Sequence, residues 1–284
     1  MSSKDLKGWD TEISASHSLF DLRLRDIWRY KDLLLMFVFR DFRAFYKQTI
    51  LGPIWFFIQP IFTMTMYLFV FGSLAGLSTD GVPQPLFYLA GIMVWSYFSE
   101  CLNKTATVFR SGAGIFGKVY FPRIIMPLSI VVSSLLRFFI QLVLFLIVYL
   151  VFWIKGDSPS PTLFLFLFPF LIFLLAIQGL SLGMIVSSLT TKYRDLALLL
   201  SFGVQLLMYA TTVVYPLSSL EGRMKFLVSL NPVTYVLEGV RKGFLGAGTF
   251  DTYALVYLVG VTVFLFFFGL IAFNKVERNF IDTI

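Results

Sequence analysis

The chain has 284 residues, of which 58% are hydrophobic and only 14% are charged. A soluble domain carries about 25% charged residues, so this composition excludes an ordinary soluble protein and indicates an all-α, polytopic membrane protein. The single cysteine excludes an intramolecular disulfide. The single histidine lies in the N-terminal tail and argues against a histidine-based metal or catalytic site.

The first 47 residues precede any stretch that could cross a membrane. Residues 1–20 are polar and mixed in charge, so we expect a flexible cytoplasmic tail there. In residues 21–47, cationic side chains recur at helical spacing opposite a row of apolar side chains. This pattern predicts an amphipathic helix on the membrane surface. Residues 21–284 together are expected to form a single transmembrane domain.

Six apolar stretches are long enough for a membrane-spanning helix, which needs roughly 20 residues. The predicted spans cover about residues 53–74, 85–104, 125–153, 162–188, 196–215 and 252–273. Residues 226–237 are apolar but too short to cross, and a second helix candidate lies around residues 235–244. We expect these two short helices, separated by a turn at Asn231-Pro232, to dip back toward the membrane on its outer side.

Lysine and arginine set the orientation of such a protein, because cytoplasmic segments carry an excess of them. Six spans place both termini on one side. That side includes the segments after the second and fourth spans and carries seventeen lysines and arginines, whereas the opposite side carries five. Both termini are therefore predicted to be cytoplasmic.

Residues 111–127 form a cytoplasmic segment that is neither a span nor a tail. Ile115 and Phe116 begin an apolar pattern that lets a short helix bury one side, and Lys118 adds positive charge. Pro122 ends the predicted helix, since proline cannot continue the backbone ladder. A short basic, aromatic helix here is either a docking site for a soluble partner or an ordinary interfacial loop helix.

Five segments spread over most of the chain carry a resemblance to a known family. They are residues 46–60 (YKQTILGPIWFFIQP), 118–127 (KVYFPRIIMP), 193–200 (YRDLALLL), 213–216 (VVYP) and 231–241 (NPVTYVLEGVR). Each is weak alone, but in this order they resemble the membrane subunit of ABC exporters for bacterial surface polysaccharides. That family comprises the O-antigen, capsule and teichoic-acid permeases, and residues 1–20 lie outside the resemblance.

The resemblance implies an assembly that composition cannot reveal. Two copies of the chain would form the channel, and two copies of a separate ATPase, which binds ATP and Mg, would dock below it. The helix that couples to the ATPase would comprise Gly114, Ile115, Phe116, Lys118, Val119, Phe121, Pro122 and Arg123. A second, smaller contact would comprise Tyr193, Arg194 and Asp195. The external gate would comprise Asn231, Pro232, Tyr235, Glu238 and Arg241.

The predicted surface helix carries a cationic face. Arg40, Arg43 and Lys47 lie three and four residues apart and therefore share one side of the helix. By the resemblance, Leu51 and Gly52 shape the loop into the first span, near the point where a lipid head group enters. Arginine can hold a phosphate with two parallel hydrogen bonds, so this face is predicted to receive the anionic head group of a lipid-linked substrate. The alternative is that it only binds anionic bilayer lipids and fixes the orientation.

The chain contains no phosphate-binding motif of the form GxxxxGK[ST], so ATP must be hydrolysed elsewhere. The chain is therefore predicted to be a transport subunit rather than an enzyme. We expect no cofactor in the chain itself, no metal site and no nucleic-acid partner.

The chain is rich in aromatic residues, with 34 Phe and 13 Tyr. Aromatic rings offer flat faces to the C–H surfaces of sugars, and tyrosine adds a hydroxyl for hydrogen bonding. The candidates for lining a sugar channel are Tyr67, Phe71, Tyr97, Tyr209 and Tyr215. The alternative is that these are lipid-facing and interfacial side chains, which membrane proteins use freely.

Two features predict contacts between spans. Arg137, in the third span, is costly in hydrocarbon and should face a carboxylate, for which Glu100 on the second span is the nearest candidate. A structural pair is favoured over a substrate contact. In the fourth span Gly179, Gly183 and Ser187 recur every four residues, which predicts close helix packing within one subunit rather than a seam between two.

These observations together predict the membrane subunit of an ATP-driven exporter in the bacterial inner membrane, with lipid-linked O-antigen as the first candidate for its cargo. Related exporters of capsule, teichoic acid or a small molecule are the alternatives within the transporter class. A membrane-embedded enzyme of lipid or glycan synthesis is the alternative outside it. That enzyme would need clustered acids or histidines at the interface, which the sequence does not offer.

Overall fold

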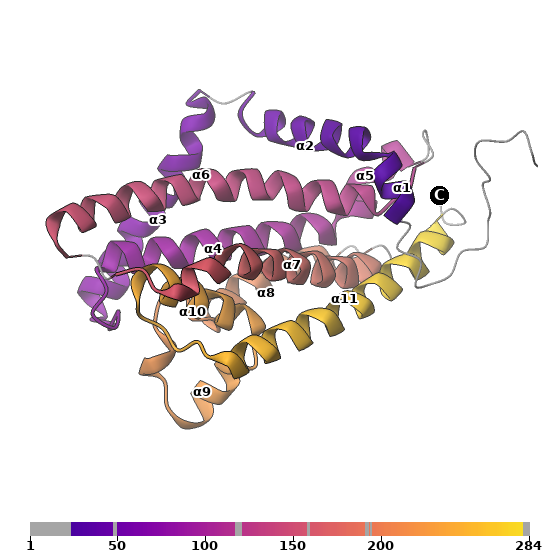
Figure 1. The fold of residues 1–284 in the computed structure, drawn as a ribbon. Helices are drawn as coiled ribbons and strands as arrows, with labels where there is room; N and C mark the ends of the chain where they lie inside the picture. Colours follow the sequence, from indigo (N-terminus) through magenta and orange to yellow (C-terminus); the bar gives the residue numbers. More distant parts are fainter. Residues whose placement is uncertain are drawn as a thin grey trace, which may run out of the picture.

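Figure 1 shows the computed structural model, which describes residues 24–47, 50–116, 121–157, 160–190, 193 and 195–280. All regular structure in these residues is helical. The helices are α1 (Leu24–Arg29), α2 (Lys31–Tyr46), α3 (Trp55–Tyr67), α4 (Gln84–Ala106), α5 (Val108–Phe116), α6 (Ile125–Lys155), α7 (Phe168–Thr190), α8 (Leu196–Tyr209), α9 (Gly222–Ser229), α10 (Pro232–Leu245) and α11 (Thr252–Phe280). Short 3-10 or π segments are η1 (Gly52–Ile54), η2 (Leu68–Leu74), η3 (Leu163–Leu167) and η4 (Leu217–Ser219). The predicted tail, residues 1–20, lies outside the described residues.

The all-helical membrane fold predicted from composition is confirmed. Among the described residues, four helical segments are long and apolar enough to cross a bilayer: Gly52–Leu74, Ile125–Lys155, Leu163–Thr190 and Thr252–Val276. They coincide with the first, third, fourth and sixth predicted spans. Helix α4 occupies the place of the second span and carries Glu100 and Lys104 near its C-terminal end. Helix α8 occupies the place of the fifth but ends at Tyr209, six residues before the predicted boundary.

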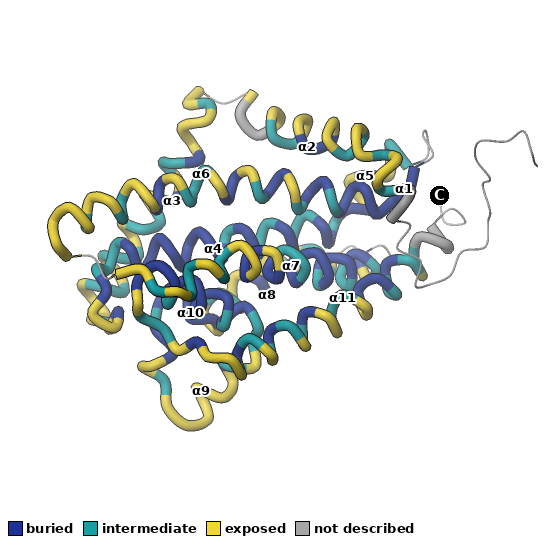
Figure 2. The backbone as a smooth tube through the Cα atoms, viewed as in Figure 1, coloured by how far each residue is buried: buried dark blue, intermediate teal, exposed yellow. Residues whose placement is uncertain are grey.

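Helix α4 is the centre of the bundle, and Figure 2 shows it buried along most of its length. It packs between α6 and α7, and α7 in turn packs against α11. A Cβ atom built on Gly179 of α7 would lie 2.7 Å from Cβ of Cys101, and one on Gly183 would lie 2.5 Å from Cβ of Thr105. These glycines therefore let α7 approach α4 closely, which confirms the predicted packing within one subunit.

Helix α2 is amphipathic, as predicted. Phe37 and Val38 are buried, whereas Arg43 and Lys47 are exposed. The apolar side of α2 packs along the N-terminal half of α6, and the two helices run alongside each other in Figure 1. At the base of this contact the Phe37 and Phe121 rings have centroids 5.7 Å apart. The cationic side of α2 thus faces away from the bundle.

The chain between α8 and α11 includes two short helices separated at Asn231-Pro232, as expected, although the first begins and ends earlier than the predicted residues 226–237. Helix α9 ends at Ser229 and α10 begins at Pro232. Asn231 caps α10, because its Oδ1 accepts a hydrogen bond of 3.1 Å from the backbone N–H of Val233. Helix α10 is buried against α4, α7, η3 and α11, whereas α9 projects from the molecule in Figure 2.

Candidate functional site

The predicted coupling segment is divided between an exposed helix end and a buried connection. Gly114, near the end of α5, is exposed, and Ile115 and Phe116 are half-buried. Phe121, Pro122 and Arg123 are buried, while Lys118 and Val119 lie outside the described residues. The described helix here is α5, Val108–Phe116, which begins before the predicted segment, and its exposed side is formed by Arg110, Ser111, Ala113 and Gly114.

Aromatic contacts fix the base of this segment. The Phe116 ring lies 5.8 Å from the Phe121 ring, and the Arg123 guanidinium lies 5.6 Å from the centroid of Phe116. Phe116 and Phe121 therefore close the connection between α5 and α6 and are turned toward the bundle. In the predicted second contact, Tyr193 and Asp195 are exposed and precede α8, and Arg194 lies outside the described residues.

The cationic face of α2 borders a shallow groove of about 590 Å³. Its lining residues are Met36, Phe39, Arg40, Arg43, Ala44 and Lys47. Arg40 also pairs with Asp41 at 2.8 Å, which partly neutralises it. The groove thus combines an apolar floor with two further cations. Leu51 and Gly52 follow it, and Gly52 has a φ of +55°, a backbone conformation that favours glycine.

Glu100 is the centre of a charge cluster between α4 and α6. Its Oε1 accepts from Nη1 of Arg137, the partner that the sequence pointed to, and also lies 2.6 Å from Nζ of Lys104. The carboxylate of Asp41 on α2 interacts electrostatically with both cations. Two of these groups, Lys104 and Asp41, were missed at the sequence level, although Lys104 follows Glu100 by one helical turn. The ion pair of Glu100 with Arg137 links α4 to α6.

The predicted channel tyrosines fall into two places. Tyr67 on α3 donates from its hydroxyl to Sδ of Met208 on α8 at 3.2 Å, and its ring lies 5.4 Å from that of Phe71. Tyr215 donates to the carbonyl oxygen of Tyr209 at 2.8 Å. Tyr67 and Tyr209 thus lie at the C-terminal ends of α3 and α8, and Phe71 and Tyr215 follow them in the chain. Tyr97 lies apart from them, buried within the subunit with its ring 5.3 Å from that of Phe138.

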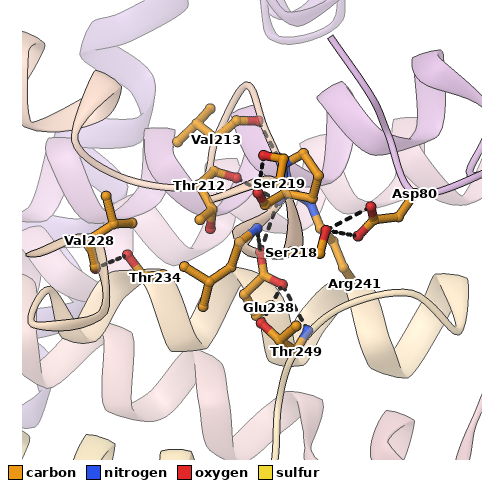
Figure 3. A network of polar contacts seen from close by, with 12 residues as sticks. Asp80, Thr212, Val213, Ser218, Ser219, Val228, Thr234, Glu238, Arg241 and Thr249 are labelled. Atoms are coloured by element: carbon orange, nitrogen blue, oxygen red, sulfur yellow. Dashed lines mark hydrogen bonds and ion pairs between the residues drawn. The ribbon is translucent and has the colours of Figure 1, made fainter. Parts of the chain in front are cut away.

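The predicted gate residues Glu238 and Arg241 form the core of a buried polar network, shown in Figure 3. Arg241 donates from Nη1 to the carbonyl oxygen of Thr212 and from Nη2 to that of Val213, the latter at 2.8 Å. Oε1 of Glu238 lies 3.4 Å from Nη1 of Arg241. Burial lowers the pKa of the Arg241 guanidinium, and the Glu238 carboxylate opposes that effect. The pair is thus a compensated charge inside the protein.

Glu238 extends the network to two further loops. Its Oε2 accepts from the backbone N–H of Thr249 at 2.9 Å, and its Oε1 accepts from that of Leu217 at 3.4 Å. Next to it, Ser218 donates to Asp80 at 2.7 Å. We call this set of contacts the Glu238–Arg241 network. The sequence indicated the two charges three residues apart, but not the backbone carbonyls that Arg241 binds.

The other predicted gate residues, Asn231, Pro232 and Tyr235, lie at the N-terminal end of α10. Nδ2 of Asn231 donates to Oγ1 of Thr211 at 2.8 Å, and Pro232 occupies the first helical position. The Tyr235 ring meets the Tyr257 ring edge-on at 5.6 Å. Within the described part of the chain, no three His, Cys, Asp or Glu side chains are grouped as metal ligands.

Comparison with known proteins gives one family and several relatives. The family model described as "ABC-2 type transporter" matches residues 32–245. The O-antigen export system permease protein RfbA of Myxococcus xanthus is 27% identical over 92% of this chain and 98% of its own length. RfbA of Klebsiella pneumoniae is 26% identical over 89% of this chain and 95% of its own length. The polysialic acid transport protein KpsM of Escherichia coli is 23% identical over 86% and 93%, respectively.

Proposed function

The chain belongs to the ABC-2 type transporter family, and from that premise we propose that it is the membrane subunit of an ATP-driven exporter of a lipid-linked surface polysaccharide. The observation that carries the proposal is the similarity to O-antigen export permeases over nearly the full length of both proteins. Such a subunit works with a separate ATPase. O-antigen is the first candidate cargo, and a capsule polysaccharide is the second because of the similarity to KpsM.

The proposed topology has six spans and two cytoplasmic termini in the bacterial inner membrane. Helix α4 serves as the second span, and α8 together with the non-helical residues 210–215 serves as the fifth. Supporting this, α4 is 23 residues long, and the non-helical residues 210–215 extend α8 toward the outer end of the bundle. The distribution of lysine and arginine supports cytoplasmic termini.

The proposed ATPase contact is the exposed side of α5, with Tyr193 and Asp195 as a smaller contact. A cysteine at Ala113 tests it, because this position is exposed and not glycine. In a Cys101→Ser background and with the partner ATPase co-expressed, Ala113→Cys should crosslink to the ATPase. A cysteine at Ser218 on the outer side is the control. Equal crosslinking at both positions, or none at Ala113, would contradict the contact.

The proposed role of the groove on α2 is to receive the phosphate of a lipid-linked substrate. Its apolar floor suits a lipid chain and its cations suit the head group. Arg43→Gln combined with Lys47→Gln should reduce export and substrate-stimulated ATP hydrolysis while basal hydrolysis continues. Lys31→Gln is the matched control, since Lys31 lies on the same helix and instead stacks on Trp28 at 5.2 Å. Export at the wild-type rate in the double variant would leave these residues as a membrane anchor only.

The proposed channel forms where two copies of the chain meet, with Tyr67, Phe71, Tyr209 and Tyr215 facing the polymer. Helix α3 and helix α8 support this, because both are apolar yet poorly buried within one subunit. Such a surface needs either lipid or another protein copy against it.

The function as a whole is tested with the purified complex of this chain and its ATPase in lipid vesicles. We expect lipid-linked polysaccharide to stimulate ATP hydrolysis and to appear on the far side of the bilayer. Stimulation by a small apolar molecule, with no response to polysaccharide, would instead assign the chain to the small-molecule exporters of the family.

A further inference from the structure

Helix α8 is too short to cross a bilayer. Its 14 residues extend about 21 Å, compared with a hydrocarbon core of roughly 30 Å. Beyond Tyr209 the chain continues through turns rather than a helix, and residues 211–214 are fully buried there. Irregular backbone at membrane depth is tolerated only when other parts of the protein satisfy its hydrogen bonds.

The carbonyl groups around this break have protein partners. The carbonyls of Leu207 and Met208 accept from the hydroxyl and the backbone N–H of Thr211, respectively. The carbonyl of Tyr209 accepts from Tyr215. These partners belong to the same segment. The carbonyls of residues 212 and 213 differ, because their donor is a side chain from another helix.

That donor is Arg241 of α10, whose planar guanidinium can reach two successive carbonyls at once. The guanidinium stacks on Phe87 of α4, 3.5 Å from the ring centroid. Gly91, one turn further along α4, leaves the space for the contact: a Cβ there would lie 2.7 Å from the Val213 carbonyl oxygen and 3.2 Å from Nη2 of Arg241. Three elements therefore meet at one side chain.

The body of α8 is attached to the rest of the subunit much less firmly. Val204 is the one buried residue that α8 contributes among its described positions. Leu198, Phe202 and Leu206 are exposed, and Leu200, Leu207 and Met208 are only partly buried against the core. The fully buried contacts of this region lie just beyond α8, where Arg241 binds the carbonyls of residues 212 and 213.

We propose that Arg241 is a positioning residue that joins the outer end of α8 to α10 and α4, so that the fifth span and the buried outer helix move as one unit during transport. The carboxylate of Glu238 offsets the buried charge of Arg241. The absence of a side chain at Gly91 leaves room for the Arg241 guanidinium and the Val213 carbonyl. The role concerns the position of α8 and does not depend on which cargo the exporter carries.

The test measures the accessibility of a cysteine at Val213, which is fully buried, in a Cys101→Ser background. Arg241→Met leaves two buried carbonyls without their donor, so labelling of Val213→Cys by a membrane-impermeant maleimide should become roughly ten- to a hundredfold faster. A cysteine at Val236, buried in α10 itself, should stay protected. Arg241→Lys keeps the positive charge but loses the planar guanidinium that binds two carbonyls at once. It should therefore give an intermediate labelling rate at Val213→Cys.

Two matched controls separate positioning from general destabilisation. Lys242→Met removes the neighbouring charge of the same helix, which contacts Phe250 and Phe164 instead, and should leave Val213→Cys protected. Gly91→Ala should expose Val213→Cys without changing any charge, whereas Gly203→Ala on α8, with no atom within 4 Å of its Cβ, should not.

Export assays complete the test, with Arg241→Met lowering transport more than Lys242→Met. Unchanged protection at Val213→Cys in the Arg241 variants would overturn the proposal. Equal labelling at Val213→Cys and Val236→Cys would overturn it as well, because the whole region would then have unfolded. Absence of polysaccharide transport by the wild-type complex would contradict only the proposed function. The positioning role of Arg241 would still be decided by the labelling result.

Discussion

Helices α9 and α10 are consecutive, short and joined at Asn231, yet the protein holds them very differently. Eleven residues of α10 are buried, and the helix contacts α4, α7, η3 and α11. In α9 the single buried residue among those described is Val228. Figure 2 shows the contrast directly, with α9 exposed and α10 enclosed.

The difference lies in the kind of contact as well as the amount. Helix α10 is held by a compensated buried charge, by the carbonyls of residues 212–213 and by close glycine contacts. Helix α9 is held mainly through its end, where Thr234 donates to the carbonyl of Val228 at 3.0 Å and Tyr257 donates to that of Leu230 at 2.7 Å. Local opening should therefore cost little free energy at α9 and a large part of the global value at α10.

The largest effect is expected from removing the acid inside α10. Glu238→Ala leaves Arg241 buried without its counter-charge and also removes the acceptor for Thr249, so the free energy of unfolding should fall by about 3–5 kcal/mol. Thermal unfolding of the purified protein in detergent measures this. Glu221→Ala, at the exposed start of α9, is the control and should melt with the wild type. Equal melting temperatures for the two variants would remove the distinction between the helices.

A smaller effect is expected where α10 meets η3. A Cβ on Gly243 would lie 3.2 Å from the backbone of Leu165, so Gly243→Ala should push the two segments apart and cost about 1–3 kcal/mol. Gly260→Ala on α11 has no atom within 4 Å of the new Cβ and should be neutral or slightly stabilising. The same thermal unfolding measurement compares them. A neutral Gly243→Ala would mean that η3 does not confine α10.

The junction between the two helices should show an intermediate sensitivity. Asn231→Ala removes the cap of α10 and should cost about 1 kcal/mol. Asn231→Asp keeps an acceptor for Val233 but loses the amide donor to Thr211, so it should retain most of the cap contribution. If Asp is as damaging as Ala, the contact to Thr211 rather than the cap holds the junction.

The parts of this fold that the sequence predicted are those governed by local periodicity. Apolar length located four of the six predicted spans among the described residues, and the cost of a charge in hydrocarbon led from Arg137 to Glu100. The early end of α8 was missed because residues 210–214, Ala-Thr-Thr-Val-Val, contain neither glycine nor proline. Beyond the break, the Val213 carbonyl is bound by Arg241, 28 residues further along, and the space around it is left by Gly91 on another helix. Contacts of this kind have no signal in local spacing.

In the candidate site too, some features were predicted from the sequence and others were not. The pattern predicted which side of α2 is cationic, and the groove lies on that side. The coupling helix was predicted over residues 114–123, and residues 117–120 lie outside the described residues. Among the described ones, Gly114, Ile115 and Phe116 end α5, Phe121 precedes α6, and the Phe116 and Phe121 rings pack on each other.

The smallest effect is expected at the C-terminal end of α9, and it distinguishes a local change from a global one. The Tyr257 hydroxyl binds the carbonyl of Leu230 at a partly exposed position, so Tyr257→Phe should cost no more than about 0.5–1 kcal/mol and leave the melting temperature almost unchanged. The loss should appear only locally, because α9 has few other contacts. We expect faster hydrogen exchange at the backbone amides of α9 and unchanged exchange in α10. Tyr253→Phe, one turn earlier on α11 and largely exposed, is the control and should alter neither helix. Faster exchange in both helices of the Tyr257 variant would show that α9 and α10 open together. The two helices would then differ in burial but not in the free energy of local opening.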